Sequence, residues 1–182
     1  MNTLKVLSLF ALAACAAVWA SAAESGRPAS LLRARLSARA SYVLGEAIRV
    51  ELTLENVSSV PVSVLNWDTP FDRAGAMGGH AFRVRRDGVE VRYRGALAKR
   101  GDPGIENYMR IEPGSSATAI ADLATAYDLS QPGTYEVEFI GHLFDVVPKA
   151  ERLPHRRDEM HGATVPAGPV TFRVIRADGH RK

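Results

Sequence analysis

The stretch Ile48-Arg-Val-Glu-Leu-Thr-Leu-Glu55 alternates apolar and polar side chains without a break. Successive side chains of a β-strand point to opposite faces of the sheet, so this pattern predicts a strand with one buried and one solvated face. The same alternation recurs, less cleanly, at 32–36, 60–64, 117–123, 134–139 and 170–175. No stretch has the spacing of a long amphipathic helix, although 121–127 could form one turn. The regular spacing of short strands indicates an all-β protein.

Residues 81–94 are predicted to form a hairpin. Asp87-Gly88 lies between two alternating runs and suits a two-residue type I′ turn. If the register continues, Phe82 lies opposite Tyr93 on an apolar face. The other face of this hairpin then carries the basic side chains Arg83, Arg85, Arg92 and Arg94.

The run Gly133-Thr-Tyr-Glu-Val137 resembles the tyrosine corner of immunoglobulin-like domains, with Val137 in place of the usual cysteine. A plain aromatic strand would look similar. The only cysteine in the chain is Cys15, so no intrachain disulfide can form. We therefore expect an immunoglobulin-like antiparallel β-sandwich that lacks an inter-sheet disulfide.

The N-terminus is predicted to be a secretory signal. Residues 1–22 join one positive charge, an apolar run and the small residues Ala20-Ser-Ala22, with cleavage expected after Ala22. The alternative is a bacterial lipobox at Leu12-Ala-Ala-Cys15, with a lipid on Cys15. The apolar run is too short for a comfortable membrane span. We expect export to the periplasm or medium. After the signal peptide, we expect a flexible leader at 23–30, the sandwich at 31–176 and a tail at 177–182.

The composition argues against several functional classes. In 182 residues, 23 basic and 20 acidic side chains give a net charge of +3, which offers little for charge-driven nucleic-acid binding. The sequence has neither a Gly-x-Ser-x-Gly nucleophile motif nor a glycine-rich phosphate loop. We expect no cofactor and no nucleic-acid partner.

Residues 142–168 interrupt the strand pattern and are predicted to be a long loop or insertion. They contain the cluster His155, Asp158, Glu159 and His161. Metal binding is the alternative for this cluster, but its spacing is not the His-Glu-x-x-His of a zinc helix. The favoured interpretation is a solvated charged loop with no metal.

Two groups of side chains are candidates for partner binding. Asn66-Trp-Asp-Thr-Pro-Phe71 either covers one end of the core or exposes an aromatic anchor. The arginine face of the hairpin either forms a basic patch with nearby residues or keeps the sheet soluble. The candidate residues are Trp67, Phe71, Arg83, Arg85, Arg92, Arg94, Lys99 and Arg100.

Several short motifs together resemble a known family. In chain order they are Leu54-Glu-Asn-Val-Ser-Ser-Val-Pro-Val62, Asn66-Trp-Asp-Thr-Pro70, Phe82-x-Val-x-Arg-Asp-Gly88, Tyr93-x-Gly95, Lys99-Arg100, Pro113-Gly114, Asp122-Leu-x-x-Ala-Tyr-Asp-Leu-Ser130 and Gly133-Thr-Tyr-x-Val137. Over residues 31–141 and the final strand, the chain is similar to the N-terminal, non-catalytic region of secreted lysine-specific, aspzincin-type metalloendopeptidases. The resemblance implies an immunoglobulin-like pro-region. The family's His-Glu-x-x-His helix and downstream aspartate ligand are absent from this sequence, so no catalytic residue is carried over.

Three functions remain as hypotheses. The leading one is a secreted, non-catalytic domain that binds another secreted or envelope protein, as an inhibitor or folding helper of a secreted metallopeptidase. The alternative is an envelope-associated module that binds glycan or an anionic surface through Arg83, Arg85, Arg92 and Arg94. The third is an enzyme with a metal site in residues 142–168. The oligomeric state is left open.

Overall fold

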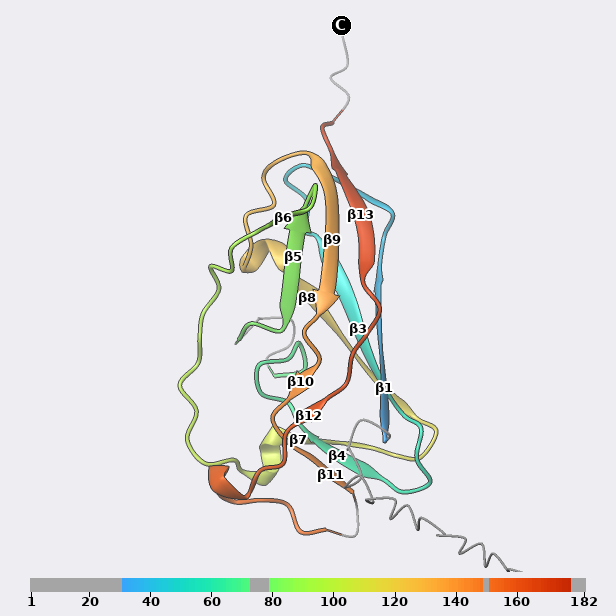
Figure 1. Ribbon diagram of the computed structural model, residues 1–182, viewed down its shortest axis with the longest axis vertical. Helices are drawn as coiled ribbons and strands as arrows, with labels where there is room; N and C mark the ends of the chain where they lie inside the picture. The colour runs from blue at the N-terminus through green and yellow to red at the C-terminus, as the bar shows by residue number, and fades with distance from the viewer. Residues whose placement is uncertain (1–30, 73–78, 149–150, 178–182) are drawn as a thin grey trace, which may run out of the picture.

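The computed structural model describes residues 31–72, 79–148 and 151–177 (Figure 1). The predicted signal peptide at 1–22 and the leader at 23–30 lie outside the described residues, as does all but the first residue of the tail at 177–182. In the described ranges, no helix is long and apolar enough to cross a membrane.

Strands dominate the described chain. They are β1 (Leu32–Ala38), β2 (Ser41–Val43), β3 (Arg49–Asn56), β4 (Val62–Leu65), β5 (Phe82–Arg86), β6 (Val89–Glu90), β7 (Tyr108–Ile111), β8 (Ser116–Asp122), β9 (Gly133–Phe139), β10 (His142–Leu143), β11 (Val146–Pro148), β12 (Ala163–Thr164) and β13 (Val170–Ile175). Helix is confined to single 3₁₀ turns, η2 (Ile105–Asn107), η3 (Leu123–Thr125) and η4 (Arg157–Glu159).

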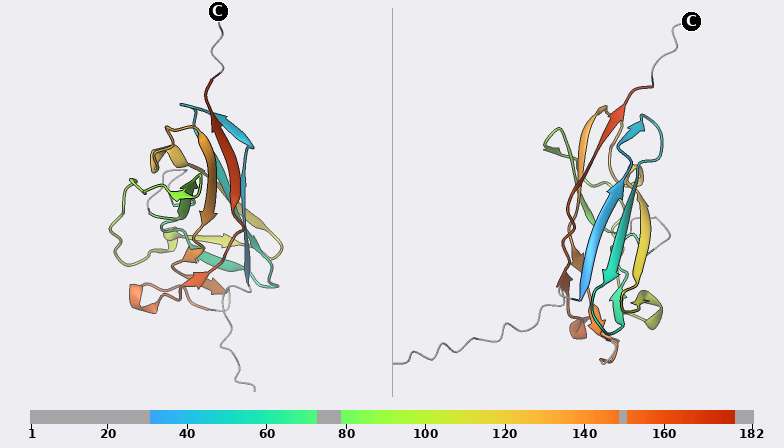
Figure 2. Two further views of the ribbon diagram at one scale, coloured as in Figure 1. Left: turned by 45° about the horizontal axis from the view of Figure 1, so that its top comes forward. Right: turned by 90° about the vertical axis from the view of Figure 1, so that its right-hand side faces the viewer.

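Two sheets pack face to face, as the edge-on view in the right panel of Figure 2 shows. One sheet has the order β1-β3-β8 and the other the order β2-β13-β9-β5-β6. Neighbouring strands are antiparallel except β2, which runs parallel to β13. The first, third and eighth strands thus share one layer, and the late strands β9 and β13 pair beside the hairpin in the other. This arrangement confirms the predicted immunoglobulin-like sandwich.

The core lies between these sheets because the strands alternate buried apolar and outward-facing side chains, as the sequence predicts. In β3, Val50, Leu52 and Leu54 are fully buried while the intervening side chains face outward. From the other sheet, Tyr135 and Phe172 stack with their ring centroids 5.7 Å apart. Burying each of these large apolar side chains contributes roughly 2 kcal/mol to stability. Burial of this kind holds the sheets together without a disulfide.

The tyrosine corner is also confirmed. The hydroxyl of Tyr135 donates a 2.8 Å hydrogen bond to the backbone carbonyl of Gln131, four residues upstream. Val137, two residues later, is completely buried. The bond ties the turn before β9 to the strand itself, and the valine fills with apolar volume the position that a cysteine occupies in disulfide-linked relatives of the fold.

The hairpin forms with the predicted turn, and its register holds through Arg85 opposite Glu90 and a 2.8 Å hydrogen bond from the N–H of Val91 to the carbonyl of Val84, but it does not continue to Tyr93. Asp87 and Gly88 both have positive φ, 49° and 84°, and β6 consists of two residues only. Phe82 pairs with Phe139 of β9 rather than with Tyr93. Tyr93 instead forms a bridge to Tyr127, and their ring centroids lie 5.4 Å apart.

Segment 142–168 forms a long connection before the last strand, but it is not a plain loop. It contributes β10, β11 and β12, and β11 pairs with β4 in a further three-stranded sheet of order β11-β4-β7. This sheet lies in the lower part of Figure 1. Val146 and Val147 are both buried. Strands this short leave too little alternation to be recognised in the sequence.

Candidate functional site

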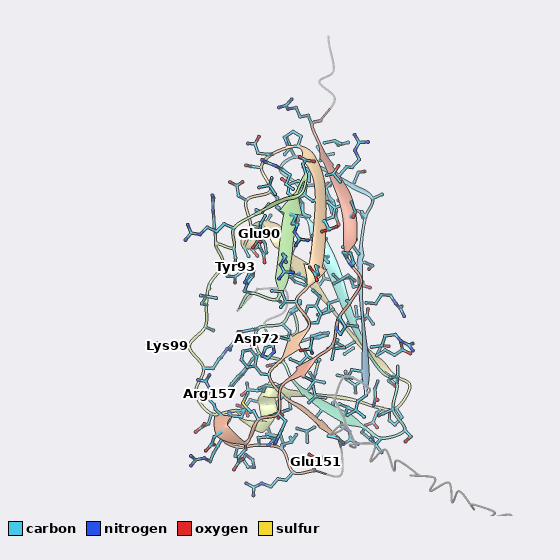
Figure 3. The ribbon with its side chains drawn as sticks, viewed as in Figure 1. Asp72, Glu90, Tyr93, Lys99, Glu151 and Arg157 are labelled. Atoms are coloured by element: carbon cyan, nitrogen blue, oxygen red, sulfur yellow. The ribbon has the colours of Figure 1, made fainter. Side chains whose placement is uncertain are left out.

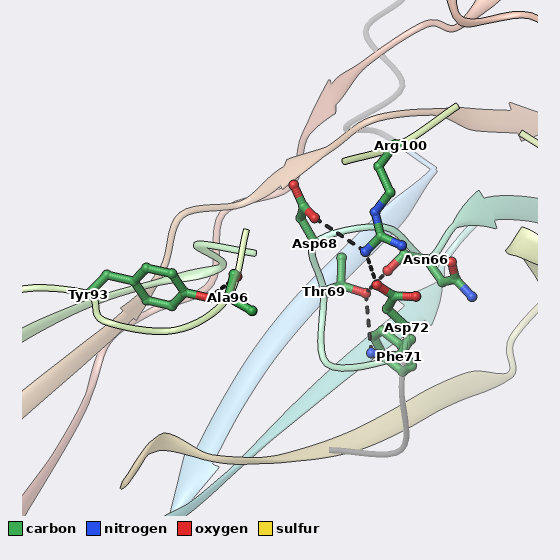
Figure 4. A network of polar contacts seen from close by, with 8 residues as sticks. All are labelled: Asn66, Asp68, Thr69, Phe71, Asp72, Tyr93, Ala96 and Arg100. Carbon is green, nitrogen blue, oxygen red and sulfur yellow. Dashed lines mark hydrogen bonds and ion pairs between the residues drawn. The ribbon is translucent and has the colours of Figure 1, made fainter. Parts of the chain in front are cut away.

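The candidate site lies where three segments meet beside the sandwich. They are the turn at 66–72 after β4, residues 79–81 before β5, and the long irregular connection at 93–104 that follows the hairpin. Figure 3 shows this connection along the left edge of the molecule, with Tyr93 and Lys99 labelled on it and Arg157 of η4 labelled near its lower end. Figure 4 shows the polar contacts that join it to the turn.

The turn at 66–72 is built by its own hydrogen bonds. The hydroxyl of Thr69 donates to the carbonyl of Asn66 at 2.6 Å and accepts from the N–H of Phe71 at 3.2 Å. Asp68 takes a positive φ of 54°, which is uncommon for a residue other than glycine. Strained backbone of this kind clusters at functional sites. The turn thereby carries two carboxylates toward the 93–104 connection.

Arg100 joins the two segments. Its guanidinium forms an ion pair with Asp72 and lies 3.5 Å from Oδ1 of Asp68. It also lies over the ring of Trp67, 5.6 Å from the centroid. The Arg100 side chain is only 14% exposed and that of Asp72 only 7%. Removing one partner of such a buried pair leaves an uncompensated charge, so Arg100 is a strong attachment point.

Asp68, Asp72, Tyr93 and Arg100 form a cluster in which two ionisable side chains have shifted pKa values. Burial raises the pKa of Asp68 above its usual range, although the neighbouring Arg100 acts in the opposite direction. Burial and the negative charge of Asp68 raise the pKa of Tyr93. Among the described residues, Asn66 Oδ1 and Arg100 Nε are buried without a hydrogen-bond partner. The cluster thus keeps polar groups in a buried setting, where a donor or acceptor without a partner is costly.

Of the predicted binding residues, the structure brings together Trp67, Phe71, Lys99 and Arg100. Trp67 is 4% exposed and Phe71 packs half-buried against the core, so both cover the core and neither is an exposed anchor. Lys99 is exposed beside the buried Arg100. The two side chains of this basic dipeptide therefore have opposite roles, since one attaches the connection and the other projects from it.

The hairpin arginines are placed elsewhere, and most are paired. Arg83 forms a 2.9 Å ion pair with Glu138, and Arg85 a 3.0 Å pair with Glu136, both on β9. Arg94 lies 3.3 Å from Asp128, while Arg92 is exposed. Because three of these four positive charges have a carboxylate partner, the geometry gives little support to a basic patch for glycan or an anionic surface.

The histidine and carboxylate residues of segment 142–168 do not converge on one point; they form hydrogen bonds and ion pairs with residues close in sequence. The N–H of His155 donates to Glu159 at 3.0 Å, and Arg156 forms a 3.0 Å pair with Asp158. In the parts of the chain that the structure describes, no three His, Cys, Asp or Glu side chains lie close enough to hold a metal ion.

A buried carboxylate that the sequence did not indicate lies at the base of the same segment. Asp145 is fully buried, accepts from the hydroxyl of Tyr108 at 2.7 Å and from the N–H of His161 at 2.8 Å. Burial and this carboxylate raise the pKa of Tyr108 well above its usual value. Both oxygens of Asp145 have donors, so the group holds β7 and the 142–168 segment together.

A hollow of about 630 Å³ lies away from this cluster, between the turn after β2 and the 3₁₀ turn η3. Leu44, Ile48, Tyr127 and Leu129 line it together with Arg94. Its lining also includes Glu46, Asp128 and Ser130, so it mixes apolar and charged side chains.

Sequence reasoning missed Asp68, Asp72, Tyr93 and Arg157 as parts of this site. Asp68 lies within the quoted Trp-Asp-Thr-Pro-Phe run and Asp72 directly follows it, so their proximity to Trp67 was visible, but their pairing with Arg100 was not. Arg157 lies 57 residues beyond Arg100, whose carbonyl it contacts. Contacts over such separations depend on the tertiary fold.

Comparisons with known proteins find one curated relative and several solved structures. No family model matches the chain. Over 112 residues it is 38% identical to an extracellular protease of Aeromonas hydrophila, a match that covers 60% of this chain and 31% of the protease. The chain therefore spans about a third of the length of this relative. It is similar to a segment of an extracellular protease.

Two solved structures among the matches are small β-domains. A CARDB domain from Pyrococcus furiosus matches with a TM-score of 0.36 and 9% identity, over 81% of this chain and 96% of that one. A PapD-like domain of a human protein matches with a TM-score of 0.36 and 13% identity, over 96% of this chain and all of that one. These scores are too low to assign the fold, which rests on the strand order and register described above.

Proposed function

We propose that this chain is an exported, non-catalytic immunoglobulin-like domain that binds a secreted metallopeptidase, as its inhibitor or folding helper. The observation that carries the proposal is the 38% identity to a segment of an extracellular protease. On this proposal, the chain retains the surface through which the matching segment contacts the rest of the protease. Such a surface can act on a peptidase supplied as a separate chain.

The chemistry of the described residues supports a binding role. The buried ionic groups, Asp145 and the Arg100–Asp72 pair, are engaged in contacts that hold segments together. The acyl-transfer and zinc motifs considered above do not occur in the sequence. On this proposal, the function depends on an exposed surface that contacts the peptidase. Loops held by a rigid sandwich commonly provide such a binding surface.

The test uses the exported chain, residues 23–182, and the Aeromonas hydrophila protease from which the matching 112-residue segment has been deleted. We expect the chain, added in trans, to bind the truncated protease and either to suppress its activity or to raise its refolding yield. Unfolded chain and an unrelated immunoglobulin-like domain serve as controls. Failure to bind, to inhibit and to assist refolding would overturn the proposal.

A further inference from the structure

We propose that residues 94–103 enter the substrate cleft of the partner peptidase as an extended, substrate-like segment, with Leu97 and Lys99 as the side chains that fill it. This inference rests on the proposed function and specifies its surface. We call residues 94–103 the presented loop. Its partner is a peptidase cleft that accepts an apolar side chain and, two residues later, a basic one.

The presented loop has the backbone of a bound peptide rather than that of a folded element. From Arg94 to Pro103 it contains no strand or helix, and it runs down the outside of the molecule from the hairpin to η2 and η4 (Figures 1 and 3). Within the described residues, the backbone N–H and C=O groups of Leu97, Ala98 and Lys99 form no hydrogen bond. Such groups can pair with the edge strand of a cleft, as peptides do in β-augmentation.

The start of the loop is tied to the sandwich. The N–H of Arg94 donates to the carbonyl of Ala126 at 2.8 Å, and its guanidinium lies 3.3 Å from Asp128. Tyr93 reaches forward, and its hydroxyl donates to the carbonyl of Ala96 at 2.8 Å. The Tyr93 ring packs on Tyr127 and lies 5.0 Å from that of His80. The packed rings of Tyr93, Tyr127 and His80 therefore fix the position of the loop as far as Ala96.

The end of the loop is tied even more firmly. The Arg100 side chain turns inward to Asp72 and Trp67, and Nη1 of Arg157 donates to the Arg100 carbonyl at 3.0 Å. The N–H of Arg157 donates to the carboxylate of Asp102, also at 3.0 Å. These contacts come from the turn at 66–72 and from η4. The two attachments hold the intervening residues in one place from both sides.

Between the attachments the side chains point outward. Leu97 is 75% exposed, among the most exposed large apolar residues of the described chain, and Lys99 is exposed as well. Their neighbours Ala96, Ala98 and Gly101 are small. Small neighbours allow the walls of a cleft to approach the backbone closely. A loop already held in its bound conformation binds more tightly because less conformational entropy is lost on association.

Competitive inhibition tests this inference. The probe is the segment-deleted Aeromonas hydrophila protease, assayed with a short peptide substrate at increasing concentrations of the exported chain. We expect inhibition that raises the KM for the peptide and leaves kcat unchanged. In the double variant Leu97→Asp with Lys99→Glu, both side chains are exposed, so the fold is retained. We expect its inhibition constant to rise at least 100-fold.

The matched control makes the same kinds of change on the hairpin. Val89 is 70% exposed on β6 and Arg92 is exposed nearby, so Val89→Asp with Arg92→Glu alters charge and hydrophobicity equally. We expect its inhibition constant to stay within threefold of the original. Binding that is non-competitive, or that survives the loop variant unchanged, would overturn the loop assignment while the proposed function stands. A native chain that neither binds nor inhibits would overturn both.

Discussion

Asn56 shows how one buried polar side chain can define a turn. Its amide donates to the carbonyls of Val60 and Ile111 at 2.8 and 2.9 Å. Its oxygen accepts from the N–H and the hydroxyl of Ser58 at 3.0 and 2.7 Å. The side chain is fully buried with its hydrogen-bonding capacity used. It fastens the loop between β3 and β4 to the end of β7.

Asn56→Ala should therefore lower the free energy of unfolding by roughly 2 kcal/mol, because buried carbonyl groups lose their donor. Urea denaturation of the exported chain measures the change. Ser59→Ala is the control, since Ser59 is exposed in the same turn and its loss should cost less than about 0.5 kcal/mol. Equal stabilities for the two variants would contradict this account.

Tyr127 is a buried residue whose ionisation should affect stability at high pH. It is 4% exposed, and its hydroxyl donates to the carbonyl of Phe82 in β5. Burial, with smaller contributions from Tyr93 and Glu90, raises its pKa well above the usual value. The folded state therefore retains this phenolic proton at a pH where the unfolded chain, with a tyrosine pKa near 10, has lost it.

Above about pH 10 the folded chain binds more protons than the unfolded chain, so stability should fall with rising pH, by up to about 1.4 kcal/mol per pH unit for this tyrosine. Below that pH the contribution is fully present. Tyr127→Phe should cost about 1 kcal/mol at pH 7 through the lost hydrogen bond, and should show a shallower alkaline loss. Urea titrations at pH 7 to 11 measure both. Parallel pH profiles for the two proteins would refute this.

At the level of the element, two turns far apart in sequence depend on each other. The N–H of Asp87 in the hairpin donates to the carbonyl of Thr134 at 2.8 Å, and its carboxylate accepts from the N–H of Thr134 at 2.9 Å. A side chain at Gly133 would clash with that carboxylate, because a Cβ there would lie 2.6 Å from it. The glycine before the tyrosine corner is needed because the hairpin turn packs on it.

Arg100 provides the most deeply buried attachment of the presented loop. Arg100→Ala leaves the carboxylate of Asp72, which is 7% exposed, without its partner, and should lower the free energy of unfolding by roughly 3 kcal/mol. Lys99→Ala, on the exposed neighbour, should stay within about 0.5 kcal/mol. Urea denaturation followed by far-ultraviolet circular dichroism measures both. A loss of less than 1 kcal/mol for Arg100→Ala would show that other contacts hold the loop.

At the level of the whole molecule, one core joins the sandwich to its loop end. Buried side chains of both large sheets belong to the same cluster as those of β4 and the 142–168 segment, including Val62, Val64, Leu143 and Val146. The extra sheet β11-β4-β7 thus packs on the same core. We therefore expect its loops to unfold together with the two large sheets.

The exported chain should therefore unfold in one cooperative transition. It contains a single tryptophan, Trp67, if Trp19 is removed with the signal peptide. Fluorescence of Trp67 reports the loop end, whereas far-ultraviolet circular dichroism reports the sheets. We expect the two urea midpoints to coincide. An earlier fluorescence transition would mean that the loop end unfolds on its own.

What the sequence alone determined about this protein was local. The alternation in 48–55, the Asp87-Gly88 turn and the Gly-x-Tyr run of β9 each follow from properties of neighbouring residues, so strand positions and fold class could be predicted. Strands of two or three residues, such as β10 and β12, show too little pattern and were not foreseen.

Only the tertiary structure decided which charged side chains form ion pairs and which are exposed to solvent. Arg83 and Glu138 are 55 residues apart in the chain, and they meet because β5 pairs with β9. The adjacent residues Lys99 and Arg100 look alike in sequence, yet one is exposed while the other is buried against Asp72 and Trp67. The reason is physical: an ion pair forms according to separation in space, which sheet order and loop path set and local sequence does not.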